Sequence, residues 1–269
     1  MTNVIWATYK KNRIGIIRAV PWSFMISRIL TGITQIIFPF LMYTYFAQGI
    51  MGEEFYVYSG SADYLTYVVL GSALNVLAVS TLMNVGRALI TELREGTLEM
   101  LLLSPASRKQ YFLGCLLEQT MRAVLEFGTV LIVGGFLGAN VEGIFRIETW
   151  LVIIVAVFSF FSLGLTLSGI MLYTRDTYIT QNTLFEIMTL VCGIMYPIQY
   201  LPKYLQVFAQ IFPLTPAVEL FRNAVLKNQH ISENKNLLLQ ISIFTIIYMV
   251  IGIYWNQKME RKILENVFE

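Results

Sequence analysis

Four charged residues interrupt the apolar stretches of this chain and are its first candidates for chemistry. Glu118, Arg122 and Glu126 are spaced four residues apart, so on a helix they share one face and can pair. Charges at membrane depth are costly and normally face a bundle interior or a water-filled cavity. The three residues line such a cavity, or the helix starts in the cytoplasm and Glu118 and Arg122 form a structural ion pair at the membrane interface. Glu186, in another apolar stretch, could lie in a pathway, at a subunit interface, or in a hydrogen bond to a neighbouring helix.

Other reactive residue types are scarce. Cys115, Cys192 and His230 do not supply the constellation that an intramembrane enzyme or a metal site needs. The sequence has no G-x-x-x-x-G-K-[ST] motif, so the chain cannot bind ATP phosphates through a P-loop. We therefore expect neither catalytic residues nor a cofactor bound by this chain.

The composition of the chain indicates what kind of protein carries these charged residues. Of the 269 residues, 56% are hydrophobic and 13% are charged, whereas soluble domains have about 25% charged residues. This excludes a soluble enzyme. A net charge of +2 without basic runs interleaved with aromatics gives no indication of a nucleic-acid partner. The chain is predicted to be a single-domain (residues 1–269), all-α integral membrane protein embedded in lipid.

Six transmembrane helices are predicted from apolar stretches of about 20 residues. They cover residues 29–47, 64–86, 110–139, 150–173, 179–196 and 237–255. The first stretch is too long for a signal-peptide core, so we expect no cleavable signal. Lys and Arg concentrate before the first span, after the second and in the tail, which predicts cytoplasmic termini. Gly134 and Gly138, like Gly164 and Ser168, are spaced to pack spans closely within one subunit.

Residues 1–22 are predicted to form an amphipathic interface helix. On a helical projection Ile5, Trp6, Tyr9, Ile16, Ile17 and Val20 lie opposite Lys11 and Arg18, although Arg13, Val4 and Ile14 depart from this pattern. This pattern is typical of a helix in the headgroup plane, whose cations face anionic lipid or a cytoplasmic partner. An ordinary basic flank that sets the topology is the alternative.

Residues 90–105 follow the second span and, as one helix, would place Glu92, Glu95 and Glu99 on a single stripe. Gly96 costs such a helix about 1 kcal/mol relative to Ala, and Pro105 marks its end. The acidic helix either presses into a groove on a soluble partner or lies solvated at the membrane surface.

Residues 197–229 contain two apolar stretches, each too short to span a membrane, separated by Pro213 and Pro216. Prolines break helices and bias the preceding residue towards extended conformations. The segment therefore predicts a re-entrant helical hairpin on the extracellular side. A surface loop with amphipathic helices is the alternative.

These three segments, in this order, resemble the permease subunits of type-2 ABC exporters over essentially the whole chain. The coupling-helix motif of that family is matched by Glu95, Gly96, Thr97, Leu98, Glu99, Leu101, Leu102 and Pro105, with Glu92 and Arg94 beside it. The hairpin motif is matched by Leu201, Pro202, Pro213, Leu214, Thr215, Pro216 and Arg222.

The resemblance implies that two permease chains form the translocation pathway in a cell membrane, here a bacterial one. Separate ABC ATPase subunits would bind ATP and Mg²⁺, and coupling helices would transmit their movement. Charge-assisted contacts from Glu92, Glu95 and Glu99 to basic groups of the ATPase would then be expected. A homodimer and a heterodimer both remain open.

An ion-coupled secondary transporter that uses Glu118, Arg122, Glu126 and Glu186 is the alternative function, although no inverted repeat is apparent. Dependence on an ATPase or on a proton gradient distinguishes the two classes. As cargo of an exporter we expect a small amphiphile such as a drug, or a peptide, before a lipid-linked glycan.

Overall fold

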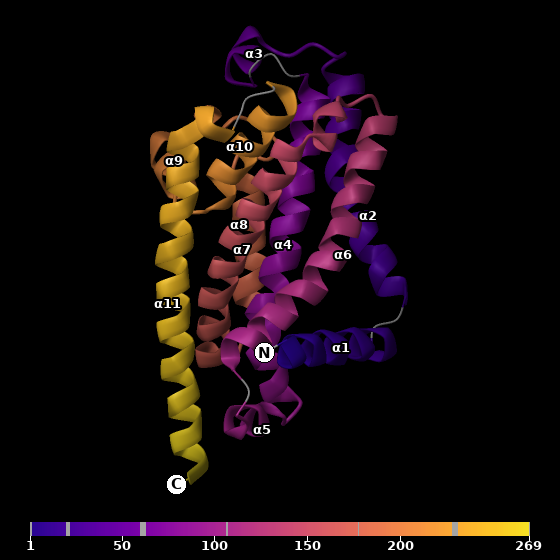
Figure 1. The fold of residues 1–269 in the computed structure, drawn as a ribbon. Helices are drawn as coiled ribbons and strands as arrows, with labels where there is room; N and C mark the ends of the chain where they lie inside the picture. Colours follow the sequence, from indigo (N-terminus) through magenta and orange to yellow (C-terminus); the bar gives the residue numbers. More distant parts are fainter. Residues whose placement is uncertain are drawn as a thin grey trace.

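Every regular element in the described residues is a helix, which confirms the predicted all-α membrane protein at this level (Figure 1). A computed structural model describes residues 2–19, 22–59, 63–105, 107–176, 178–227 and 231–268. His230 therefore lies outside the described residues.

Four long helices run along the bundle: α4 (Tyr64–Arg94), α6 (Arg108–Phe136), α7 (Ile147–Thr174) and α11 (Lys235–Phe268). Helix α4 is central and packs against α6, α7, α2 (Trp22–Leu41) and α10 (Leu214–Leu226). The apolar window of α4 is 83% buried and that of α7 is 78% buried, whereas those of the first span and α11 are 17% and 11% buried. The interior is thus built on α4 and α7, while the first span and α11 lie at the outside.

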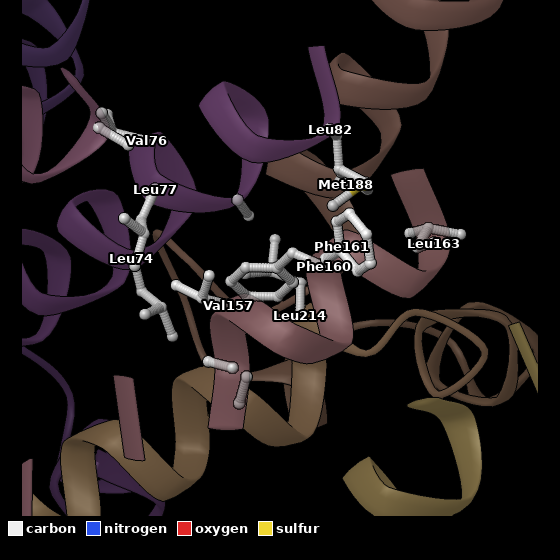
Figure 2. Close-up of a cluster of buried hydrophobic side chains, with 14 of the residues drawn as sticks. Leu74, Val76, Leu77, Leu82, Val157, Phe160, Phe161, Leu163, Met188 and Leu214 are labelled. Carbon is white, nitrogen blue, oxygen red and sulfur yellow. The ribbon is translucent and has the colours of Figure 1, made fainter. Parts of the chain in front are cut away.

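The hydrophobic core extends along α4, α6 and α7, and Figure 2 shows the part where α4 and α7 meet α8 (Tyr178–Val191) and α10. Phe160 of α7, Met188 of α8 and Leu214 of α10 are fully buried there. Side chains of α4, among them Leu74 and Leu77, complete the cluster. These four helices therefore pack around one cluster of buried side chains.

Small residues allow the long helices to approach one another. A Cβ atom added to Gly134 of α6 would lie 2.4 Å from a methyl carbon of Val69 on α4. One added to Gly164 of α7 would lie 3.0 Å from Val85. Both glycines pack helices within the subunit, as predicted. Gly138 instead has a φ of +103° after the end of α6 and has no such close neighbour.

Four of the six predicted spans are confirmed by length and composition within the described residues: Ile29–Phe46, α4, α7 and α11. Helix α6 is long enough but carries Glu118, Arg122 and Glu126 in its middle. Helix α8 has 14 residues, about 21 Å at 1.5 Å per residue, against a hydrocarbon core of about 30 Å. The six-span count therefore stays a prediction.

Helix α2 ends in an irregular turn. Pro39 lies inside it and cannot donate a backbone hydrogen bond. The π-helical turn η1 (Met42–Phe46) follows directly. Wider turns of this kind commonly follow a local break in the α-helical ladder.

The remaining elements gather at the two ends of the bundle (Figure 1). Helices α1 (Thr2–Ala19) and α5 (Leu98–Leu103) lie at the end where the C-terminus also lies. Helices α3 (Glu53–Ser59), α9 (Lys203–Ala209) and α10 lie at the other end. Short 3₁₀ turns connect elements at Glu142–Phe145, Ile198–Tyr200 and Ile231–Asn234. Helices α9 and α10 occupy the segment predicted as a hairpin; whether it dips into a membrane stays a prediction.

Helix α1 lies across the end of the bundle and packs against α6 (Figure 1). A Cβ atom on Gly114 would lie 2.6 Å from the Cβ of Thr8, so the two backbones approach closely there. Tyr9, on the predicted apolar side, is buried, whereas Trp6 on the same side is 61% exposed. The apolar side of α1 is therefore divided between the protein and the surroundings.

Candidate functional site

The turn between α4 and α5 divides the segment that the sequence predicted as one helix. Helix α4 ends at Arg94 and α5 begins at Leu98. Gly96 adopts a φ of +70°, in the left-handed region that glycine enters without a steric penalty. The single acidic stripe expected over residues 90–105 is wrong for this reason.

Glu92 is buried rather than presented with Glu95 and Glu99, and only 4% of it is exposed. It forms an ion pair with Lys11 of α1 and accepts a hydrogen bond from the Thr97 hydroxyl in the turn. The Tyr111 hydroxyl of α6 also donates to it, at 3.1 Å. One carboxylate thus connects α4, the turn, α1 and α6; we call these four residues the Glu92 network.

The rest of the turn has a buried and an exposed side. Leu98 and Leu102 of α5 are 1% and 8% exposed, whereas Met100 and Leu103 are 74% and 64% exposed. The exposed residues of the predicted motif are Arg94, Glu95, Gly96, Glu99 and Pro105, with Thr97 and Leu101 intermediate. A surface that combines exposed carboxylates with large apolar side chains can bind a basic and apolar groove.

Arg108, the first residue of α6, fixes the far end of α5. Its Nη2 donates to the Leu102 carbonyl at 2.6 Å. Its Nε lies 3.5 Å from a carboxylate oxygen of Glu260 on α11. The short helix is thus attached to α6 at its end as well as to α4 at its beginning.

Two of the charges of α6 form the predicted pair. Arg122 Nη2 donates to Glu118 at 2.9 Å, to Gln119 at 2.6 Å and to Asn84 of α4 at 3.3 Å. Glu126 instead accepts a hydrogen bond from the Ser80 hydroxyl of α4 at 2.6 Å. The charges therefore connect α6 to α4, with Glu118 6% exposed.

Glu186 stands apart from these groups. It is exposed on α8, although Phe185 and Met188 beside it are buried. Within the described residues it forms no ion pair. Its carboxylate thus projects from the outer face of a short apolar helix.

Arg222 of the predicted hairpin is 8% exposed, and backbone carbonyls surround its guanidinium. It donates to Gly193 at 2.8 Å and to Tyr67 and Ile194 at 2.9 Å each. Its Cζ lies 3.3 Å from the centroid of the Tyr67 ring. Burial lowers the pKa of Arg222 below its ordinary value, although arginine stays protonated at neutral pH. We call these groups the Arg222 cradle; it joins α10 to α4 and to the end of α8.

The other residues of the hairpin motif shape its two helices. The Thr215 hydroxyl donates to the Ala209 carbonyl at 2.6 Å and connects α10 to α9. Pro213 caps α10, while Leu214 and Pro216 are buried in its first turn, where a proline is tolerated. Pro202 precedes α9 in the same way, with Leu201 partly buried before it.

Three side chains of these sites are not predicted from the sequence. The pattern indicates Lys11 only as a cation facing lipid or a partner, and it does not single out Tyr111 or Tyr67. Lys11 and Glu92 are 81 residues apart, and Tyr67 and Arg222 are 155 apart. Local spacing carries no signal for such contacts.

No cluster of three or more His, Cys, Asp or Glu residues that could hold a metal ion occurs in the part of the chain that the structure describes. Cys115 and Cys192 are buried free thiols. A cavity of about 370 Å³ lies between α1, α4 and α6 and is lined by Lys11, Arg87 and Glu118, among others. It lies beside the Glu92 network.

Comparison with protein families gives a match to the model described as ABC-2 type transporter, over residues 9–226. Comparison with curated proteins gives no match. The matched range runs from α1 through the Glu92 network to the end of α10, and so contains both sites described above. The chain therefore belongs to the ABC-2 type transporter family and is a membrane-spanning permease of an ABC transporter.

Proposed function

We propose that this chain is the permease subunit of an ATP-driven exporter whose ATPase subunits are separate polypeptides that bind ATP and Mg²⁺. The observation that carries the proposal is the α4–α5 turn. There, exposed Glu95 and Glu99 adjoin the exposed apolar side chains of Met100 and Leu103. Carboxylates around an apolar patch suit a groove with basic edges on a soluble protein.

The Glu92 network gives this surface a route to the membrane helices. Hydrogen bonds to a charged group are stronger than those between neutral groups, and Glu92 accepts bonds from three segments. A force on the turn would therefore move α4, α6 and α1 together. This role replaces the direct ATPase contact predicted for Glu92, while Glu95 and Glu99 remain the proposed contacts.

A second permease chain is proposed to cover α2 and α8. Glu186 is an exposed carboxylate in an apolar helix, and such a group is costly against lipid. The apolar window of the first span is only 17% buried. A second copy or a related chain packed here would remove Glu186 from lipid and enclose a pathway, whether as a homodimer or as a heterodimer.

The proposed orientation places α1, α5 and the C-terminus in the cytoplasm of a bacterial cell, with α9 and α10 outside. The position of α1, α5 and the C-terminus at one end of the bundle supports it (Figure 1). A cysteine replacing Lys203 should then react with an impermeant thiol reagent added outside the cells, because the native cysteines are buried. Labelling only from the cytoplasm would contradict this orientation. We propose a small amphiphile or peptide as cargo.

Co-purification tests the proposal. The tagged chain is expressed with its neighbouring reading frames and extracted in mild detergent, and ATP hydrolysis is measured in the eluate. We expect an ATPase to accompany the wild type, and the Glu95→Lys, Glu99→Lys variant to lose it. The matched control is Glu53→Lys, Glu54→Lys, because both residues are exposed on α3 at the other end. Equal recovery of the ATPase in all three proteins would exclude the turn as the docking surface.

A further inference from the structure

A cavity of about 220 Å³ lies between α7 and α11, with Leu93 of α4 also in its lining. Two cations, Arg175 and Lys262, line it together with Tyr173. The remaining lining is apolar and includes Leu172 and Met259, which are buried. Since a water molecule occupies about 30 Å³ in the liquid, the cavity can hold a small hydrated anion.

The two cations come from different helices and meet beside one aromatic ring. Lys262 Nζ lies 5.7 Å from the centroid of the Tyr173 ring, within the range of a cation–π contact. Arg175 caps the C-terminus of α7 with a φ of 55° and a ψ of 14°. Glycine or asparagine usually occupies this left-handed position, so the conformation does not explain why an arginine stands here.

The depth of the cavity matches that of lipid headgroups. Tyr173 and Arg175 lie at the end of α7, which Figure 1 places at about the level of α1. Helix α1 crosses the end of the bundle, as a helix at the membrane surface would. Helix α11 lines the cavity opposite α7. Only 11% of its apolar window is buried, so it offers a face to lipid. A headgroup could reach the cavity from that side.

We propose that this cavity binds the phosphate group of an anionic phospholipid in the leaflet on the α1 side of the membrane. Basic pockets between transmembrane helices on the cytoplasmic side are suited to anionic headgroups. Arg175 and Lys262 contact the phosphate, Tyr173 lies at the interface, and Leu172 and Met259 contact the glycerol and upper acyl carbons. A docked soluble protein would not need the apolar lining that Leu172 and Met259 provide.

The experiment measures the thermal midpoint of the full-length chain in detergent while dioleoyl phosphatidylglycerol or dioleoyl phosphatidylcholine is added. The test variant is Arg175→Gly, Lys262→Ala, in which glycine suits the positive φ and favours an intact fold. The matched control is Lys258→Ala, Arg261→Ala. It removes the same charge from exposed positions of α11 that do not line the cavity.

We expect phosphatidylglycerol to raise the midpoint of the wild type more than phosphatidylcholine does, and the control to behave likewise. The test variant should lose at least half of that difference, and native mass spectrometry should show one fewer tightly bound phosphatidylglycerol. An undiminished difference in the test variant, or an equal loss in the control, would overturn the proposal. Inorganic phosphate giving the same rise would identify a free-anion site and overturn the lipid assignment. Loss of a co-purifying ATPase with unchanged lipid response would identify a protein contact instead.

Discussion

Glu92 and Arg222 are both buried charges, Glu92 within α4 near its end and Arg222 bound to α4 near its beginning, and their partners differ in kind. Glu92 receives its hydrogen bonds from three side chains, Lys11, Thr97 and Tyr111. Arg222 donates to three backbone carbonyls. Burying a charge is tolerated only where such bonds replace water.

The difference indicates how each end of the bundle can respond to movement. Carbonyls of Gly193 and Ile194 are fixed by the chain, so the Arg222 cradle holds α10, α8 and α4 in one arrangement. Side chains can change rotamer, so the Glu92 network can break and form again as the turn moves. In the proposed exporter the Arg222 end is therefore the rigid one and the Glu92 end the movable one.

The largest effect is expected from Arg222→Ala. It would leave three buried carbonyls without their donor, at a cost of about 3 kcal/mol or more. We expect a lower thermal midpoint in detergent and a lower yield of monodisperse protein. Lys227→Ala is the control, because Lys227 is exposed and lines, together with Arg222, a cavity of about 80 Å³. Equal midpoints for the two variants would show that the cradle contributes little.

Gly71→Ala tests the same cradle from α4. The added Cβ would lie 2.5 Å from both Arg222 Nη2 and the Ile194 carbonyl oxygen. Overpacking of this kind costs about 1–3 kcal/mol, so we expect a smaller loss of thermal stability than for Arg222→Ala. Gly128→Ala, where no atom lies within 4 Å, is the control. A stability equal to that of the control would mean that both the guanidinium and the Ile194 backbone shift at little cost.

Removal of one side chain from the Glu92 network should have a graded effect on stability. Glu92→Ala removes the acceptor of three bonds and should cost about 1–3 kcal/mol. Lys11→Ala should cost no more than about 1 kcal/mol, because the Lys11 side chain is 52% exposed. Denaturant or thermal unfolding of the two variants beside Glu95→Ala checks this order. A Glu95→Ala protein as unstable as Glu92→Ala would contradict it.

Glu186→Gln should have the smallest effect on stability, because the side chain is exposed and forms no described ion pair. We expect an unchanged thermal midpoint and an unchanged yield of the complex, but reduced export. The measurement is transport per assembled complex in vesicles. Unchanged export at unchanged yield would refute a role for Glu186 in the pathway.

The sequence predicted those parts of the fold that depend on local pattern. Apolar runs gave α4, α7 and α11, and the four-residue spacing gave the Glu118–Arg122 pair. The end of α8 at Val191 was not predicted. A turn at Gly193 follows it, and the Gly193 carbonyl accepts a hydrogen bond from Arg222. That turn depends on a tertiary contact.

The motif residues of the candidate site were predicted, but neither their geometry nor partners such as Lys11 and Tyr111 were. The motif around Gly96 was found, and its left-handed conformation explains why the helix breaks there. The burial of Glu92 depends on Lys11, from a helix that the sequence assigned to lipid or a cytoplasmic partner. Periodicity assigns residues to the faces of one helix and cannot show that two helices cross.

The central claim is that the turn passes ATPase movement to the membrane helices through Glu92. The most direct test is the number of cargo molecules exported per ATP hydrolysed, measured in vesicles for the wild-type complex and for Glu92→Gln. Glutamine keeps the size of the side chain but removes the ion pair with Lys11. The account predicts continued ATP hydrolysis with a ratio reduced several-fold. An unchanged ratio in a fully assembled complex would contradict it.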